Sequence, residues 1–297
     1  MLPIVDTHHH LWDLERFELP WLDSAPTLAN NYLMDDYRQA TQDHHVAKTV
    51  YMEVDVAPHQ QNAEVAYITE LCGDAANPMA GAVIGGHPDA EGFADYIRSH
   101  ADNPFVKGVR QVLHVPEAAP GHCLQPDFVG GVRLLGELGL SFDLCFRPAE
   151  LGDAIQLADH CPTTQFIVDH CGNGDPQIIA GLTKPDQDSP FAHQAQQWRD
   201  DMAALGQRPN VVCKISGIIA RVDPANWSPD TLAPTIDHCL NSFGAERVVF
   251  GGDWPVCTLG APLGDWIGAL RQIIANRPET EQRALLHDNA ARLYRLT

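Results

Sequence analysis

The chain has 297 residues, of which 44% are hydrophobic and 20% charged, a composition that excludes a disordered polymer and fits a folded globular protein. Its formal net charge of −20, from 39 acidic and 19 basic residues, repels polyanions, so neither nucleic acid nor a membrane surface is an expected partner. Small anionic substrates are not excluded, because a few arginines in a pocket can bind them locally.

Cysteine usage and the N-terminus indicate the compartment. The eight cysteines lie in apolar contexts without a CxxC pair, which predicts buried free thiols in a reducing environment and not a zinc knuckle or a disulfide framework. The chain opens directly on an apolar strand pattern without a signal peptide, and no apolar run approaches the roughly 20 residues of a membrane span. We therefore expect a cytoplasmic protein.

Eight short apolar runs recur along the chain, each too short for a core helix and without the strict alternation of a half-exposed strand. Such runs are typical of parallel strands that are covered on both faces. In chain order they are PIVDTH near residue 4, KTVYMEV near 50, MAGAVIG near 82, VKGVRQVL near 109, SFDLCF near 143, TQFIVDH near 167, NVVCKIS near 213 and RVVFGGD near 250.

Segments with helical periodicity separate these runs, among them QNAEVAYITELCGDA, FVGGVRLLGELG, PAELGDAIQLADH, FAHQAQQWRDDMAALG and TLAPTIDHCLNSFG. Eight strand–helix units are what a right-handed (β/α)8 barrel requires. No linker or shift of composition marks a boundary, so we predict one α/β domain over residues 1–297, a TIM barrel of regular or distorted shape. A doubly wound open sheet is the second possibility, but no GxGxxG follows the first strand.

Polar side chains gather at the carboxyl ends of the predicted strands, where barrel enzymes carry their active sites. The long intervals 14–46 and 172–209 would form a lid or pocket wall there, and Trp21, His59 and Trp227 could face either the ligand or the core. This enrichment predicts an enzyme. The polar strand-end residues are His8, His10, Glu53, Asp55, His87, Arg110, His114, Arg147, Asp169, His170, Lys214, Ser216 and Asp253.

The first strand carries three consecutive histidines in DTHHHLWD. Because side chains alternate along a strand, His8 and His10 point to one side and His9 to the other. The outer pair suits Zn²⁺ or a similar ion, or it is a polar strand end bonded to backbone and water. Asp6 either orients one of these histidines or accepts hydrogen bonds from backbone amides.

Two later motifs reach the same face. His170 ends the sixth strand in VDHCG, and Asp253 follows two glycines in FGGDWPV at the end of the eighth. A carboxylate there can accept a proton from water or bind a metal, and its alternative role is to cap the next helix. Each motif is weak alone, but together they indicate a site built from strands 1, 6 and 8.

With these motifs the chain resembles the amidohydrolase superfamily, and within it the TIM-barrel lactonases that include L-fuconolactonase, L-rhamnonolactonase and 2-pyrone-4,6-dicarboxylate lactonase. The matching segments span almost the whole chain: VDTHHHLWD, VKGVRQVL, DLCFRP, VDHCG, CKISGI, FGAERVVFGGDWPV and DNAARLYRL. The resemblance implies ring opening of a sugar lactone, such as an aldonolactone, or of a related carboxylated lactone.

The resemblance also implies roles for the motif residues. Asp253 would activate water, with His170 as a second catalytic residue, and His8, His10, His170 and Asp253 would be the metal ligands or would polarise the substrate carbonyl directly.

For substrate binding the resemblance implies Arg110, Arg147 and Trp12. Arg147 could instead pair with Asp143 or Glu150.

Two departures bear on the metal. Strand 4 ends without the lysine that is carboxylated in binuclear members, since Lys107 lies at its start, and strand 5 ends in Phe146-Arg147 instead of a histidine. A bridged two-metal centre is therefore not expected. The resemblance implies either one divalent ion, zinc by ligand type, or a metal-independent enzyme.

We therefore predict a cytoplasmic lactone hydrolase of carbohydrate metabolism that acts on a small molecule and is a monomer or homodimer. A metal-dependent decarboxylase of the same superfamily is the alternative, and it would release CO₂ in place of a ring-opened acid. A non-catalytic binding barrel would turn over no lactone.

Overall fold

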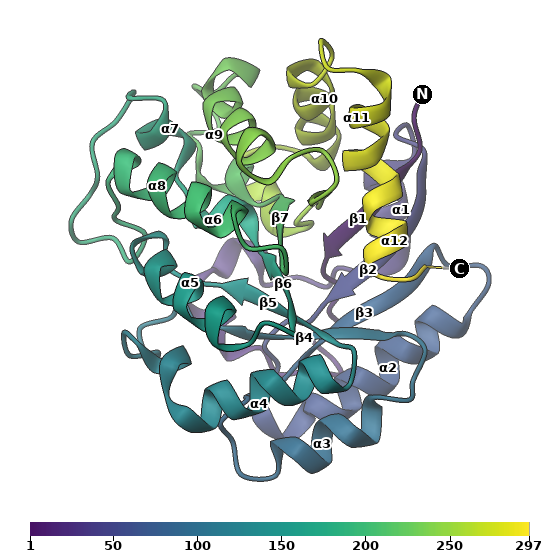
Figure 1. The fold of residues 1–297 in the computed structure, drawn as a ribbon. Coiled ribbons are helices and arrows are strands. Elements are labelled where there is room, and N and C mark those ends of the chain that lie inside the picture. Colours follow the sequence, from purple (N-terminus) through teal and green to yellow (C-terminus); the bar gives the residue numbers. More distant parts are fainter. Residues whose placement is uncertain (297) are drawn as a thin grey trace.

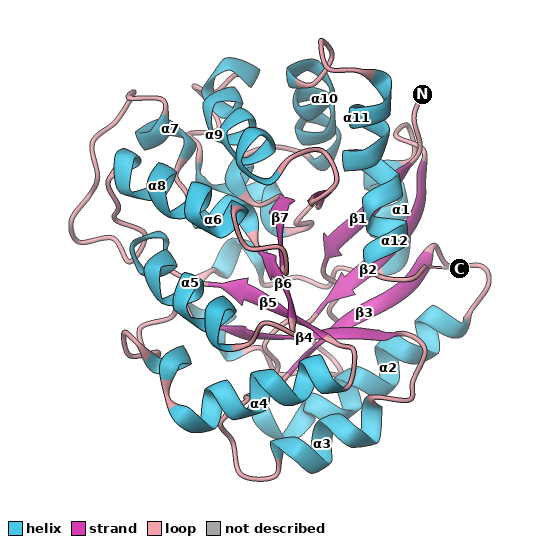
Figure 2. Cartoon of the chain, in the orientation of Figure 1, coloured by secondary structure: helices cyan, strands magenta, loops and turns pink. Residues whose placement is uncertain are grey.

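The computed structural model describes residues 1–296 and shows eight parallel strands in sequential order, surrounded by helices (Figures 1 and 2). The strands coincide with the eight apolar runs, and the predicted (β/α)8 barrel is confirmed. They are β1 (Ile4–His9), β2 (Val46–Met52), β3 (Met79–Gly85), β4 (Val106–Val112), β5 (Ser141–Cys145), β6 (Gln165–Val168), β7 (Val211–Ile215) and β8 (Val248–Phe250).

The five helices expected from periodicity are present as α2, α4, α5, α8 and α9. The largest difference is at α8, which begins at Ala195 because Phe191 lies at the pocket and is not part of the helix. The helices are α1 (Met34–Thr41), α2 (Gln61–Gly73), α3 (Phe93–His100), α4 (Pro126–Glu137), α5 (Leu151–His160), α6 (His170–Asn173), α7 (Pro176–Ile179), α8 (Ala195–Gly206), α9 (Pro229–Phe243), α10 (Leu263–Ile273), α11 (Glu279–Arg283) and α12 (Asn289–Leu293).

The barrel closes where β1 meets the end of β8. His9 and Trp254 form a parallel bridge across this seam. The amide of Asp253 donates to the His8 carbonyl at 2.6 Å, and the amide of His10 donates to the Trp254 carbonyl at 2.7 Å. These bonds hold the histidine motif and the aspartate motif in register, although they lie at opposite ends of the chain.

The buried carboxylate of Asp6 fastens the same seam. Its Oδ1 accepts hydrogen bonds from the amides of His8 (3.0 Å) and Gly252 (2.7 Å), and its Oδ2 accepts one from the Tyr37 hydroxyl (2.7 Å). Burial raises the pKa of Asp6 to about 6, although these hydrogen bonds oppose the rise. A Cβ on Gly252 would lie 2.4 Å from Asp6 Oδ2, so the close approach requires glycine. Of the two roles considered for Asp6, the contact with backbone amides is the one observed.

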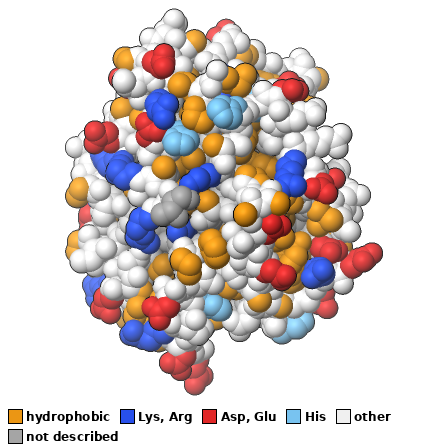
Figure 3. All heavy atoms as spheres, turned by 90° about the vertical axis from the view of Figure 1, so that its right-hand side faces the viewer, with side chains coloured by type: hydrophobic (Ala, Val, Ile, Leu, Met, Phe, Trp, Pro, Cys, Tyr) orange, Lys and Arg blue, Asp and Glu red, His pale blue; other side chains and the backbone are white. Residues whose placement is uncertain are grey.

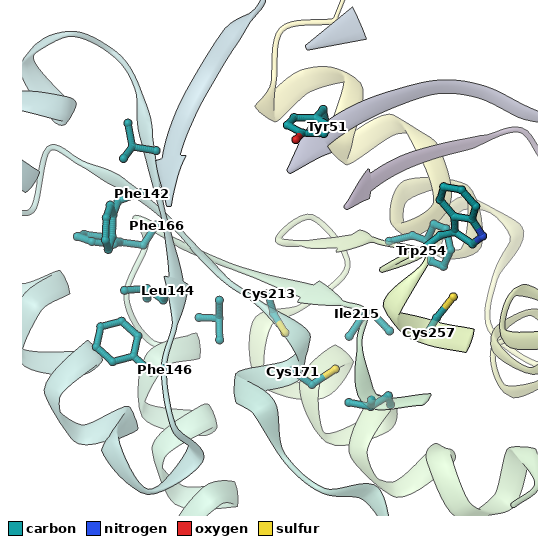
Figure 4. Packing of buried hydrophobic residues seen from close by; sticks show 14 of the residues in the cluster. Tyr51, Phe142, Leu144, Phe146, Phe166, Cys171, Cys213, Ile215, Trp254 and Cys257 are labelled. Carbon is teal, nitrogen blue, oxygen red and sulfur yellow. The ribbon is translucent and has the colours of Figure 1, made fainter. Parts of the chain in front are cut away.

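Two hydrophobic layers support this arrangement. A small apolar cluster inside the barrel includes Val5, Val50 and Val249, and a large cluster fills the space between the strands and the helices, part of which is drawn in Figure 4. All eight cysteines are buried free thiols, as predicted.

On the face drawn in Figure 3, acidic and basic side chains are interspersed with apolar ones. Within residues 1–296, no helix has the length and apolar character needed to cross a membrane.

Candidate active site

A cavity of about 430 Å³ opens at the carboxyl ends of the strands. Its aromatic wall includes Trp12, Trp21 and Phe191. A larger cavity of about 900 Å³ adjoins it and shares Asp55 and Arg110 with it. The polar lining of the smaller cavity includes His10, Arg110, His114, His170, Arg221 and Asp253.

Asp253 meets both histidines of the outer pair. Its Oδ1 lies 3.6 Å from His8 Nε2 and 3.5 Å from His10 Nε2. The Nδ1 atom of His10 lies 2.9 Å from the Met52 carbonyl and 3.1 Å from the Glu53 carbonyl. Because a carbonyl only accepts hydrogen bonds, Nδ1 carries the proton and Nε2 presents its lone pair to the pocket.

His9 points away from this group, as strand alternation predicts. Its ring centroid lies 4.7 Å from that of Tyr37 and 6.1 Å from that of Tyr51. Burial lowers the pKa of His9 to about 3, so this imidazole is neutral and packs in the shell around the barrel.

His170 reaches the site from a left-handed turn after β6. Its φ is 52°, and the three following residues also have positive φ. The ring centroid lies 4.5 Å from that of His8, and Nδ1 is 3.0 Å from the Ser216 hydroxyl. A Cβ on Gly217 would lie 2.2 Å from His170 Nδ1, so glycine is needed for this packing. Burial lowers the pKa of His170, and the imidazole is neutral near pH 7.

Beneath His8 lies a buried ion network. Lys214 Nζ contacts Asp143 at 2.7 Å and Asp169 at 2.8 Å, and none of these side chains is exposed to solvent. His8 Nδ1 is 3.5 Å from Asp169. Burial lowers the pKa of His8 well below its ordinary value, so this imidazole is neutral, with Nδ1 directed at Asp169 and Nε2 at Asp253.

Arg110 lies where the sequence placed it, at the pocket. Its Nε is 2.5 Å from Glu53 Oε1, its Nη2 donates to the Glu53 carbonyl at 2.8 Å, and its Nη1 is 3.4 Å from His8 Nε2. Glu53 therefore orients the guanidinium and neutralises its charge.

Arg147 is not among the residues that line either cavity. Its Nη1 donates to both carboxylate oxygens of Glu150, at 2.8 and 3.0 Å, and its Nη2 donates to the carbonyls of Val115 and Ala118. The pairing with Glu150, which the sequence had left open, occupies this guanidinium and holds a loop.

Of the aromatic residues considered, Trp12 and Trp21 line the cavity, whereas His59 and Trp227 do not. Trp12 is fully buried and donates from Nε1 to the Asn30 carbonyl at 2.7 Å, so only its ring is available to a ligand.

Arg221, just beyond β7, lines the cavity but belongs to no motif. Its Nη2 donates to Asn173 Oδ1 at 2.7 Å, and its guanidinium stacks 3.6 Å from the centroid of the Phe191 ring. Within the described residues it forms no ion pair with a carboxylate. Burial lowers the pKa of Arg221 to about 10. The pocket wall therefore holds a half-buried positive charge that has no carboxylate in direct contact, although the charges of Asp175 and Asp253 act on it from further away.

The donors fit one divalent ion. One atom each from His8, His10 and Asp253 lie within 4.8 Å of one another, and His8, Asp169 and His170 form a second, overlapping group. Imidazole nitrogens and one carboxylate are ligands that zinc accepts, and His8 Nε2 also faces Arg110 Nη1 at 3.4 Å. Lys107 donates to the Pro104 carbonyl at 2.7 Å at the start of β4 and is not part of either group.

A (β/α)8 barrel with a histidine pair on β1, a histidine after β6 and an aspartate after β8 presents a group of His and Asp side chains at the carboxyl ends of its strands, which is where barrel enzymes carry their active sites. A family profile described as amidohydrolase matches residues 5–296, so the chain belongs to the amidohydrolase family. This match confirms the family resemblance seen in the sequence and the expectation that the protein is a hydrolase.

Three known proteins illustrate the relationship. An L-fucono-1,5-lactonase from Burkholderia multivorans is 26% identical over 302 residues, which cover 98% of this chain and 96% of the relative. The crystal structure of an amidohydrolase from Burkholderia multivorans with bound zinc has a TM-score of 0.83 at 24% identity, covering 99% of this chain and all of that one. A 2,6-dihydroxybenzoate decarboxylase from Rhizobium shares the fold with a TM-score of 0.60 at 15% identity, covering 99% of each chain.

The ion network predicts a large stability effect. Replacing Lys214 by methionine leaves Asp143 and Asp169 buried without their cation, and the free energy of unfolding should fall by about 3–5 kcal/mol. Breaking the more exposed Arg208–Asp159 pair, 2.9 Å apart, with Arg208→Ala is the control and should cost less than about 1 kcal/mol. Urea unfolding of both variants measures the difference, and equal losses would contradict a buried network.

Proposed function

We propose that the protein hydrolyses a lactone to its hydroxy acid, with Asp253 as the general base. The observation that carries this proposal is the convergence of Asp253 with His8 and His10 at the floor of a cavity large enough for a small ring. The L-fucono-1,5-lactonase among the relatives supports lactones as the substrate class.

The geometry supports a two-step proton transfer. Asp253 accepts a proton from water as the water attacks the lactone carbonyl carbon. Negative charge then develops on the carbonyl oxygen, where the Arg110 guanidinium and the imidazole of His170 are available as donors in a buried setting. When the tetrahedral intermediate collapses, protonated Asp253 returns its proton to the leaving alkoxide of the ring.

A divalent ion bound by His8, His10 and Asp253 would supply Lewis-acid polarisation and would lower the pKa of water. The zinc-bound amidohydrolase structure supports this choice of ion. The proton on His10 Nδ1 and the contact of His8 Nδ1 with Asp169 fix both imidazoles with Nε2 toward Asp253.

The substrate proposed is a lactone that carries an anionic group. Arg110 is already neutralised by Glu53, whereas Arg221 is half-buried at the cavity wall and forms no ion pair within the described residues. A buried guanidinium is stabilised when a carboxylate binds it through two parallel hydrogen bonds. We therefore favour a carboxylated lactone over a neutral aldonolactone.

Replacing Asp253 by asparagine tests the catalytic role. The variant keeps the shape of the site but cannot accept the proton, so kcat should fall by about 10²- to 10⁴-fold. Asp200→Asn is the matched control, because this exposed carboxylate on α8 accepts a hydrogen bond from Gln196 at 2.9 Å and does not line the cavity, and the variant should keep near wild-type rates. Lactone hydrolysis at an unchanged rate in the Asp253 variant would refute the assignment.

Arg221→Met tests the anionic substrate. Losing a charge-assisted pair should raise KM for carboxylated lactones by about 10- to 100-fold and leave KM for neutral lactones nearly unchanged. Arg221→Lys keeps the positive charge but not the planar guanidinium. Its KM for carboxylated lactones should lie between the values of the wild type and of Arg221→Met. The comparison needs a panel of pyrone-type, muconolactone-type and aldonolactone substrates, and an equal loss on every lactone would contradict the role.

Removing metal from the protein tests whether a bound divalent ion is required for hydrolysis. Dialysis against a chelator should abolish hydrolysis, and added Zn²⁺ should restore it in the wild type but not in the His10→Ala variant, which lacks one ligand. Unchanged turnover at negligible metal content would show that the imidazoles act without an ion. Release of CO₂ without acid from ring opening would instead identify a decarboxylase.

A further inference from the structure

Three of the eight cysteines converge at one point of the core. The Sγ atoms of Cys171, Cys213 and Cys239 all lie within 4.8 Å of one another, and each residue is fully buried. They come from three separate elements: the turn after β6, strand β7 and helix α9. Cys171 and Cys213 are labelled in the close view of the core in Figure 4.

The thiol cluster is distinct from the His–Asp centre. Lys214 points into the barrel toward Asp143, Asp169 and His8. Its neighbour Cys213 therefore points outward, because side chains alternate along β7. There it packs in the hydrophobic layer between strands and helices, together with Cys171 and Cys239.

Without a metal, weak hydrogen bonds link the three thiols to one another, and Cys171 Sγ lies 3.8 Å from the Lys214 carbonyl oxygen. A buried cysteine behaves as a small apolar residue and can be satisfied singly in the core. Cys72, Cys123, Cys145, Cys161 and Cys257 are such cases, since within residues 1–296 they join no group of potential ligands. Cys171, Cys213 and Cys239 differ from these five in bringing three sulfur atoms within 4.8 Å of one another, close enough for one ion to contact all three.

We propose that Cys171, Cys213 and Cys239 form a binding site for a soft metal ion, separate from the catalytic centre. Thiolates select soft cations, and the group offers three sulfur ligands with no histidine or carboxylate. Binding of a divalent ion releases the three thiol protons and forms three metal–sulfur bonds without any change of oxidation state. The net charge left in the core is then −1 and not the −3 of three bare thiolates.

A metal ion at this site would also stabilise the left-handed turn that carries His170. Cys171 follows His170 directly, and its carbonyl accepts a hydrogen bond from Trp198 Nε1 at 2.9 Å. The metal would tie this left-handed turn to β7 and α9. Binding is therefore expected to raise thermal stability, since an ion that binds only the folded state stabilises it.

Cadmium is the probe, because its thiolate complexes absorb in the ultraviolet by sulfur-to-metal charge transfer, whereas imidazole and carboxylate ligands give no such band. Cd²⁺ is added to the reduced full-length protein, both in the folded state and during refolding from denaturant, so that burial does not block access. We expect a charge-transfer band that saturates at a single Cd²⁺ per chain, and a higher melting temperature.

Cysteine and Asp253 variants distinguish metal binding at the thiol cluster from metal binding at the His–Asp centre. In the His10→Ala background, which lacks one ligand of the His–Asp centre, Cys239→Ser and Cys213→Ala should each abolish the saturable band and the rise in melting temperature. Cys161→Ser, another fully buried cysteine outside the cluster, should keep both in the same background. Asp253→Asn should keep the band, because it alters only the His–Asp centre. No band in the wild type after refolding, or a band that persists in folded Cys213→Ala and Cys239→Ser proteins, would overturn the proposal.

Discussion

The hydrogen bonds that close the barrel between β1 and the end of β8 are the constraint on which the site depends. Asp6 joins the backbone of the histidine motif to Gly252, and the Asp253 amide bonds directly to the His8 carbonyl. Residues almost 250 positions apart, with Asp6 and Gly252 separated by 246, are thereby fixed within hydrogen-bonding distance. The convergence of Asp253 with His8 and His10 follows from this closure, since the seam carries all three.

Charge is distributed unequally across the floor of the barrel. Lys214 is compensated by two carboxylates and Arg110 by Glu53, so both cations have a carboxylate in direct contact. His8 and His170 are neutral because burial lowers their pKa values. The Nε2 atoms of His8 and His10 face Asp253, where a metal ion or water would bind. Arg110 and His170 line the cavity as donors for the substrate's carbonyl oxygen. Arg221, which has no ion pair within the described residues, is assigned to recognition of an anionic group.

The sequence alone predicted the features that depend on the local pattern of residues. Apolar runs located all eight strands, and strand alternation separated His8 and His10 from His9. It was insufficient where a side chain's reach depends on tertiary partners. Arg147 and Arg221 both follow strands, but Glu150 and two carbonyls hold the first away from the cavity, whereas Phe191 and Asn173 hold the second at its wall. The thiol cluster was equally hidden, because it depends on how α9 packs against β7.

The most direct test of the central claim, water attack on a lactone carbonyl at the His–Asp centre, is isotope tracing. The lactone that reacts fastest is opened in ¹⁸O-labelled water under single-turnover conditions, and the product is analysed by mass spectrometry. The account predicts one labelled oxygen in the new carboxylate and none in the new hydroxyl group. Label in the hydroxyl group would show attack at the alkyl carbon of the ring, and would contradict the proposed roles of Asp253 and the donors around the carbonyl.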